Sequence, residues 1–393
     1  MDRLPGFRDF YPEPLPHKDV WSIDARNYIF NTWEKVLSYY NFRQYDGPPL
    51  EPLELYTLKS GEEIVGQLYN FIDKGDRNVS MRPEMTPTLA RMVASHERNY
   101  RKPIKWFSIP QLFRYERQQK GRLREHFQLN ADMFGESSPE ADAELIALLI
   151  DILRSFGLTA EDFVIRISSR KAWSDFFNAH SSDPSKAYAF YQIIDKLERE
   201  SPEISSQKLA ELGFDYDEIS QFIDSGTPTE ELQTILKNLE ARKLSEFVKI
   251  DYGVIRGLAY YTGIVFEAFD RKGHFRAIAG GGRYDNLISL ISGGKLDPIT
   301  NTVKGGKVNM PSLGFGMGDV VLTELLKERG LLPSFNPTLD IYALIENESL
   351  RPQTLSAIET FRQNGYSVDF SLTPLKSEKQ FKRAIDLNAV WSF

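Results

Sequence analysis

The sequence predicts an α+β protein, because it holds both strand-like and helix-like segments and one long region is helical alone. Two aromatic, β-like runs, KWFSIPQLF (105–113) and FQLNADMFG (127–135), bracket a long basic loop and predict a hairpin. Residues 171–244, in contrast, carry charged helical patterns and no β-like run, which predicts an inserted helical subdomain. A chain of 393 residues accommodates two or three domains.

Before residue 170, helical and extended patterns alternate. Apolar residues recur at helical spacing within 17–41, and Thr86 stands at the N-cap position of a second helix. A strongly periodic helix over 139–156 ends at Gly157. The remaining segments read as extended: an edge segment at 47–56, a hairpin over 67–84 with its turn at Lys74–Asp76, and a strand at 163–169.

After residue 245, the strands return. VKIDYG and TGIVFEAFD (262–270) read as strands, whereas the glycine clusters GGGRYDNL (280–287) and GFGMG (314–318) read as tight turns that lead into helices. A linker containing Pro333 and Pro337 follows. Residues 337–393 then alternate strand, helix, strand, helix and strand, which predicts a C-terminal α/β domain that stops short and looks truncated.

The basic hairpin is the most informative stretch. Nine Lys or Arg residues and one acid, Glu116, lie between Arg98 and Arg124, although the chain as a whole has a net charge of −7. Arginine side chains on a rigid hairpin can each bind two phosphate oxygens through the guanidinium group. The local excess of positive charge in an acidic chain therefore favours an anionic ligand. A solvated basic hairpin without a ligand is the alternative on charge alone.

Composition excludes several classes of site. The chain has no cysteine, and its five histidines are scattered without ligand spacing, so disulfides, thiolate chemistry and a transition-metal site are not expected. No apolar signal core opens the chain and no run reaches the length of a membrane span, so we expect no membrane partner and a cytoplasmic protein.

Two further patterns hold candidate site residues. Arg256 lies in VIRGLAYYTG, where it either holds a carboxylate or phosphate or snorkels at the surface. Glu84 and Thr86 in RPEMT fall on one side of an extended segment, where they could receive an ammonium group; a capped helix start is the alternative. The glycine clusters lack the spacing of a phosphate-binding loop or a dinucleotide fold.

Taken together, RPE-x-T, FRYER with GRLRE, RGL-x-YYTG and GGGRYDNL, in this order, resemble the histidyl-tRNA synthetase family. The resemblance begins at LPGFRDFYPE and implies an antiparallel six- or seven-stranded sheet flanked by helices, in a homodimer. It divides the chain into a catalytic core at 1–170 and 246–332, a helical insertion at 171–245, and a partial anticodon-binding-like domain at 337–393. The implied substrates are L-histidine, ATP with Mg²⁺, and tRNA(His).

The resemblance also implies a role for each matching residue. Arg114 would hold the α-phosphate, Glu116 the adenine amino group and Arg122 the γ-phosphate of ATP. Arg256 would neutralise the reacting carboxylate and the α-phosphate, which makes it and Arg114 the catalytic pair. No side chain is assigned as a metal ligand. The histidine substrate would be bound by a larger set, in which the first three take the ammonium group and the others lie at the imidazole: Glu84, Thr86, Gln128, Asp132, Tyr260 and Tyr261.

Three departures from the family pattern matter. Val321 stands where many relatives carry an arginine that contacts ATP, Ala259 replaces a frequent aspartate, and the C-terminal domain ends at Phe393. The leading hypothesis is a histidine–tRNA ligase. The alternatives are the catalytically silent paralogue that regulates ATP phosphoribosyltransferase, and a stand-alone histidine sensor.

Overall fold

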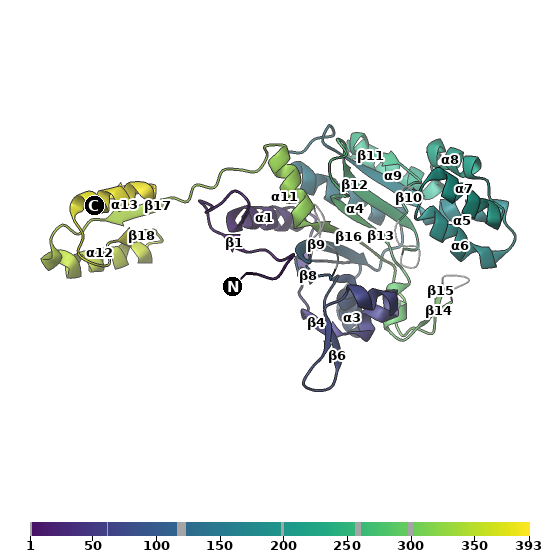
Figure 1. The fold of residues 1–393 in the computed structure, drawn as a ribbon, viewed down its shortest axis with the longest axis horizontal. Helices are drawn as coiled ribbons and strands as arrows, with labels where there is room; N and C mark the ends of the chain where they lie inside the picture. Colours follow the sequence, from purple (N-terminus) through teal and green to yellow (C-terminus); the bar gives the residue numbers. More distant parts are fainter. Residues whose placement is uncertain (1, 61, 116–122, 198–199, 256–260, 298–301) are drawn as a thin grey trace. The chain divides into compact units, whose positions relative to one another are not determined.

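The computed structural model describes residues 2–60, 62–115, 123–197, 200–255, 261–297 and 302–393. It separates into two compact units (Figure 1). The larger unit comprises the residues up to Arg8 and Arg26–Leu332, and the smaller unit comprises Asp9–Ala25 and Pro333–Phe393. The domain boundaries given above remain predictions.

A central sheet forms the frame of the larger unit. Its described strands follow the order β11 (Val248–Ile250), β10 (Phe163–Ser169), β12 (Ile264–Asp270), β13 (Ala279–Arg283), β16 (Ser312–Gly318), β9 (Glu125–Phe134), β7 (Ile104–Ser108) and β3 (Arg43–Gln44), and β8 (Gln111–Phe113) pairs with β9. Neighbours from β10 to β7 are antiparallel.

The expectation of a purely antiparallel sheet is wrong at both edges. Strand β11 is parallel to β10, and β3 is parallel to β7, so the described sheet is mixed and has nine strands. Parallel neighbours need a long crossover. Both edges have one, because the helical region connects β10 to β11, and more than fifty residues separate β3 from β7.

One face of this sheet packs into the main hydrophobic core. Alternate residues of β9 and β16, such as Ala131 and Phe315, are buried there against α4 (Pro139–Ser155), α1 (Ile23–Tyr39) and α11 (Asp319–Glu328). Helix α4 agrees with the predicted helix to within a residue, whereas α1 begins six residues later than predicted, after the short strand β2 (Trp21–Ser22) that pairs with β1 (Phe10–Tyr11).

A second, antiparallel sheet lies in the larger unit in the order β4 (Leu50–Pro52), β6 (Asn78–Met81) and β5 (Asn70–Ile72). It confirms the predicted hairpin. The predicted edge segment at 47–56 contains β4, but the prediction is wrong at its end, because α2 begins at Glu54. Helices α2 (Glu54–Ser60), α3 (Thr86–His96) and α10 (Leu287–Ile291) contact one another beside it, and the short pair β14 (Lys295–Asp297) and β15 (Thr302–Lys304) contacts α10 through β15.

Residues 170–241 form the helices α5 (Arg170–His180), α6 (Ala187–Ile194), α7 (Pro202–Leu212), α8 (Tyr216–Ser225) and α9 (Glu230–Ala241) (Figure 1). Their ends follow ordinary capping chemistry. The Asp215 carboxylate accepts hydrogen bonds from the backbone N–H groups of Asp217 and Glu218, and Gly213 ends α7 in the left-handed region at φ 89°. Aromatic side chains fill the centre, with the rings of Phe190 and Phe214 4.4 Å apart.

The C-terminal part of the smaller unit has the predicted order of elements: β17 (Leu339–Ala343), α12 (Arg351–Gln363), β18 (Val368–Phe370), α13 (Ser377–Asp386) and β19 (Ala389–Ser392). Its three strands are parallel, with β17 in the middle. That this domain is truncated remains an expectation.

Candidate active site

The second face of the central sheet carries a row of polar side chains on β9. Residues paired across neighbouring strands point to the same side. On this side β9 presents Gln128 and Asp132, and β16 presents the glycines that pair with them, Gly318 and Gly314. A Cβ atom at Gly314 would lie 2.0 Å from Oδ1 of Asp132. The absence of a side chain on β16 therefore gives the Asp132 carboxylate the space it occupies.

The two glycine clusters are not turns, as the sequence suggested, but the interiors of β13 and β16. Gly282 of β13 pairs with Gly314 of β16, and a Cβ atom at Gly282 would lie 2.9 Å from Cδ1 of Tyr261. Tyr261 thus lies over β13, two strands from Asp132. The structure brings these two predicted imidazole-binding residues to neighbouring positions on one face.

Asp132 is the most unusual carboxylate of this face. Its side chain is buried, and its Oδ1 accepts a hydrogen bond from the hydroxyl of Tyr284, a residue that the sequence argument did not assign to the site. Within the described part of the chain, its Oδ2 has no hydrogen-bond partner. Burial raises the pKa of Asp132 to about 7, and the hydrogen bond from Tyr284 opposes that rise.

Gln128 and Asn130 continue the polar row toward the basic hairpin. Gln128 is half-buried and leans over Gly316, where a Cβ atom would come within 2.9 Å of its Cδ atom. The side-chain amide of Asn130 donates to the Gln128 carbonyl oxygen (3.1 Å). The half-buried side-chain amide of Gln128, beside the glycines of β16, can form hydrogen bonds with a polar ligand.

Arg114 and Glu84 approach this face from a different direction. The Nε of Arg114 donates to the carbonyl oxygen of Pro83 (3.0 Å), which places the guanidinium group next to the half-buried Glu84. Its backbone N–H donates to the carbonyl oxygen of Arg124 (2.8 Å) and closes the base of the basic hairpin. A cation therefore lies beside the Pro83–Glu84 segment, and a guanidinium group in this position suits a phosphate.

Glu84 and Thr86 do not lie in an extended segment, contrary to the sequence argument. Thr86 is the first residue of α3, and Met85 before it has helical φ and ψ angles (−96° and −26°). The alternative of a capped helix start is also wrong in detail, because the N-cap residue is Met85 and makes no side-chain capping bond. Glu84 thus lies just before a helix N-terminus, where backbone N–H groups have no helical partner.

A buried ion cluster that sequence reasoning missed fixes the base of the hairpin. Arg8 contacts Glu125 of β9 (2.7 Å) and Asp319 of α11 (2.8 Å), and all three side chains are at most 2% exposed. The backbone N–H of Arg124 donates to the carbonyl oxygen of Gly6 (3.0 Å). Val321, at the position of the absent arginine, packs against the main core.

Four predicted site residues, Glu116, Arg122, Arg256 and Tyr260, lie outside the described residues, as does Ala259. Among the residues that are described, no group of three or more His, Asp and Glu side chains could hold a metal ion. Within the same residues, no helix has the length and apolar character needed to cross a membrane.

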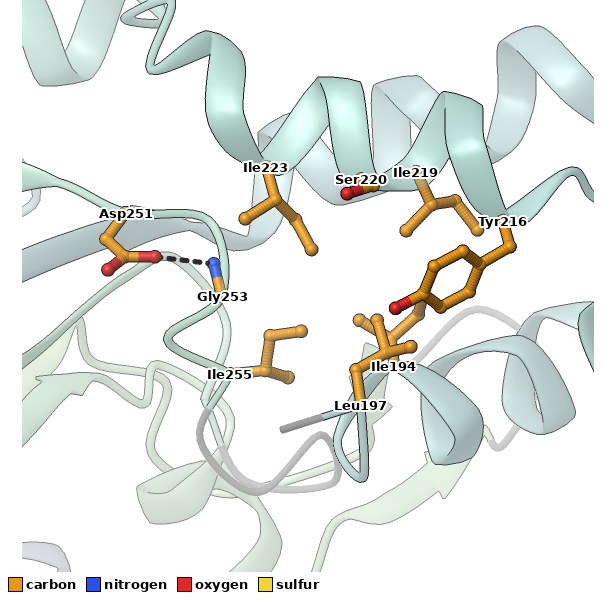
Figure 2. Close-up of a pocket in the computed structure, with 9 residues that line it drawn as sticks. All are labelled: Ile194, Leu197, Tyr216, Ile219, Ser220, Ile223, Asp251, Gly253 and Ile255. Atoms are coloured by element: carbon orange, nitrogen blue, oxygen red, sulfur yellow. Dashed lines mark hydrogen bonds between the residues drawn. The ribbon is translucent and has the colours of Figure 1, made fainter. Parts of the chain in front are cut away.

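An apolar pocket of about 180 Å³ lies elsewhere, between α6, α8 and residues 251–255 (Figure 2). Isoleucines from both helices and the phenol ring of Tyr216 form its wall. Asp251 at its edge accepts a hydrogen bond from the backbone N–H of Gly253 (3.0 Å) and contacts Arg166 (3.5 Å). Its carboxylate is therefore already engaged within the chain.

Solved structures share this architecture. The fold superimposes on an ATP phosphoribosyltransferase regulatory subunit/histidyl-tRNA synthetase from Bacillus halodurans with a TM-score of 0.75 at 21% identity, covering 100% of this chain and 97% of the other. It superimposes on apo histidyl-tRNA synthetase from S. aureus with a TM-score of 0.70 at 23% identity, covering 100% and 90%. This likeness shows that the chain shares the fold of these solved structures.

Sequence comparison gives the family. The family model of histidyl-tRNA synthetase matches residues 24–298. The histidine–tRNA ligase of Opitutus terrae is 42% identical over 98% of this chain and 88% of its own length, and that of Leptospira biflexa is 38% identical over 96% and 86%. The chloroplastic/mitochondrial enzyme of Arabidopsis thaliana is 36% identical over 98% and 78%. This chain belongs to the histidyl-tRNA synthetase family.

Proposed function

We propose that this protein is a histidine–tRNA ligase, which activates L-histidine with ATP and transfers it to the 3′ end of tRNA(His). The observation that carries the proposal is the 42% identity to a histidine–tRNA ligase over 98% of the chain. The polar residues of this sheet face add chemical support, because a buried carboxylate, a tyrosine and an amide on one face suit a substrate with an imidazole ring and an ammonium group.

The first reaction forms one bond and breaks another. A carboxylate oxygen of histidine attacks the α-phosphorus of ATP, the bond to the β-phosphate breaks, and pyrophosphate leaves with histidyl-adenylate as the product. The tRNA hydroxyl then attacks the adenylate carbonyl carbon and AMP leaves. No side-chain nucleophile is needed, so the residues contribute by positioning and by neutralising charge.

We assign the ATP side of the site to Arg114, Glu116, Arg122 and Arg256. Arg114 extends from the base of the basic hairpin, and its contact with the Pro83 carbonyl fixes the direction of the guanidinium group. A fixed guanidinium group needs no reorganisation when charge builds up on the α-phosphate, which is why we assign it a catalytic role. Arg256 is assigned the same role on the carboxylate side by family likeness.

We assign the histidine side to Glu84, Thr86 and Gln128 for the ammonium group, and to Asp132, Tyr260 and Tyr261 for the imidazole. Glu84 supports this arrangement, because it directly follows Pro83, whose carbonyl oxygen accepts a hydrogen bond from Arg114 of the proposed ATP side. An ionised Asp132 accepts a hydrogen bond from a ring N–H, which selects imidazole over an apolar ring.

Mg²⁺ is proposed as the partner of ATP, to neutralise phosphate charge. The described residues offer it no protein cage, since the carboxylates of Glu125 and Asp319 already contact Arg8. We therefore assign the roles in activation and transfer to side chains of the protein. A homodimer in the cytoplasm is also proposed, on family likeness only.

Histidine-dependent exchange between ATP and labelled pyrophosphate tests the activation step, and charging of tRNA(His) tests the transfer. We expect exchange with histidine and none with the other standard amino acids. Exchange that is absent, together with histidine-sensitive stimulation of an ATP phosphoribosyltransferase, would instead identify the regulatory paralogue. The named relatives over nearly the full chain do not favour that alternative.

A further inference from the structure

Tyr45 occupies a position on the polar sheet face that no motif assigns. It follows β3 directly, and its backbone N–H donates to the carbonyl oxygen of Phe107 (2.9 Å), which extends the pairing of β3 with β7 by one residue. Arg43 pairs with Trp106, and Trp106 pairs with Asp132. Since alternate residues share a face, Tyr45 lies on the same side of the sheet as Asp132.

The surroundings of the Tyr45 ring agree with this placement. The ring centroid lies 5.9 Å from that of Trp106, and the half-buried ring packs against the hydrophobic cluster that contains Tyr284, the hydrogen-bond donor to Asp132. Burial raises the pKa of Tyr45 well above its usual value, and the charge of Asp132 adds to the rise. The two side chains are therefore close enough to interact electrostatically.

The hydroxyl of Tyr45 and Oδ2 of Asp132 share a second property. Both oxygens are buried, and neither has a hydrogen-bond partner among the described residues. Buried polar atoms are rarely left without a partner, because losing water without a replacement is costly. Two such atoms on one face of the sheet indicate a small polar ligand that satisfies both.

A neutral imidazole has the matching chemistry, because one ring nitrogen donates a hydrogen bond and the other accepts one. Asp132 Oδ2 can accept from the ring N–H, and the Tyr45 hydroxyl can donate to the other nitrogen. Building on the proposed function, we propose that Tyr45 is a specificity residue for histidine, which pairs with the imidazole nitrogen that Asp132 does not bind.

Replacing Tyr45 with Phe removes one oxygen and keeps the ring contact with Trp106. We expect Tyr45→Phe to lower kcat/KM for histidine in pyrophosphate exchange by about tenfold or more, because the ring nitrogen is left without a partner. KM for ATP should stay within twofold of the wild-type value. The matched control is Tyr342→Phe, since Tyr342 of β17 is also buried with an unpartnered hydroxyl within the described chain; we expect it to leave histidine activation unchanged.

Substrate analogues separate recognition from a structural effect. The 2-linked and 3-linked pyrrolylalanines each keep one ring N–H and lack the accepting nitrogen. The wild-type protein should prefer histidine over the better of these by about tenfold or more, and Tyr45→Phe should lose most of that preference. A variant that slows histidine and both pyrroles equally, or that changes histidine activation less than threefold, overturns the assignment. Wild-type protein without histidine-dependent exchange overturns the proposed function itself and this assignment with it.

Discussion

The hydroxyl of Tyr284 holds one oxygen of the Asp132 carboxylate, although the two residues are 152 positions apart in the chain. Tyr284 follows β13 and Asp132 lies in β9. The strand between β13 and β9 is β16, to which Gly314 belongs. Because this bond fixes the orientation of the carboxylate, Oδ2 is directed consistently toward whatever occupies the polar face. A site that recognises a ring nitrogen through a hydrogen bond needs an acceptor with a fixed orientation, such as Oδ2 of Asp132.

Histidine binding should weaken as the pH falls through about 7. Burial raises the pKa of Asp132 to about 7, and only the ionised carboxylate accepts a ring N–H without competition from its own proton. We expect KM for histidine to rise about twofold between pH 8.5 and pH 7, a range in which free imidazole is largely neutral. Asp132→Asn should show a higher KM throughout and lose this dependence; an unchanged slope in the variant would assign the titration to another group.

The same group also sets a pH dependence of stability with a definite sign. Its pKa in the folded state is above the usual aspartate value near 4, so between about pH 4 and pH 7 the folded protein binds a proton that the unfolded chain does not. The contribution of Asp132 to the free energy of unfolding should therefore decrease as the pH rises through this range. Denaturation of the wild type and Asp132→Asn, compared at several pH values, isolates the contribution of this residue.

Loss of Arg114 should affect chemistry more than folding. Among the described residues, its guanidinium group makes one hydrogen bond, to a backbone carbonyl oxygen, so its removal breaks no ion pair within that part of the chain. Single-turnover formation of histidyl-adenylate should slow by roughly 10²–10³-fold in Arg114→Ala, the scale of one transition-state donor. Arg154→Ala is the control, because Arg154 pairs with Asp151 on α4 and is half-exposed. A change below threefold in Arg114→Ala would show that this arginine is peripheral.

Local sequence patterns predicted those elements whose side chains repeat with a clear period. Strand β10 matches the predicted bounds, and α4 ends one residue early, because both present continuous apolar faces to the core. The strands β13 and β16 were misread as turns. Glycine has no side chain, so a glycine-rich strand shows no alternation of apolar and polar residues. The residue paired with each glycine on the neighbouring strand shows why no side chain fits there.

The site was predictable to the extent that its residues fall within motifs. Asp132 and Tyr261 were assigned through family likeness, and the structure places them on one face of the sheet. Tyr284, Tyr45 and Arg8 were not assigned, because their importance comes from contacts between segments that are distant in sequence. The single signal in the chain for Tyr284 is its place two residues after a glycine run, which a pattern argument cannot distinguish from a turn.

Arg8 should be critical for stability. Its removal would leave the buried carboxylates of Glu125 and Asp319 without their cation, and an uncompensated buried charge typically costs about 3–5 kcal/mol. Chemical denaturation of Arg8→Ala should show a loss of this order. Arg77→Ala is the control, because Arg77 is 76% exposed in its pair with Asp73 and should contribute little to stability. Equal effects of the two variants would mean that the buried cluster rearranges or admits water.

Gly314→Ala tests whether the empty strand face is what makes the site. The new methyl group would lie 2.0 Å from Oδ1 of Asp132 and 2.9 Å from the backbone oxygen of Ala131, so the carboxylate must move and lose its bond to Tyr284. We expect kcat/KM for histidine to fall by about 10²-fold or more, the usual order for a binding group displaced by about an ångström. Gly318→Ala, on the same strand, adds a methyl group whose nearest neighbour is His126 Cδ2 at 4.0 Å and should behave as wild type. If Gly314→Ala activates histidine as well as Gly318→Ala does, the Asp132 carboxylate does not bind the substrate.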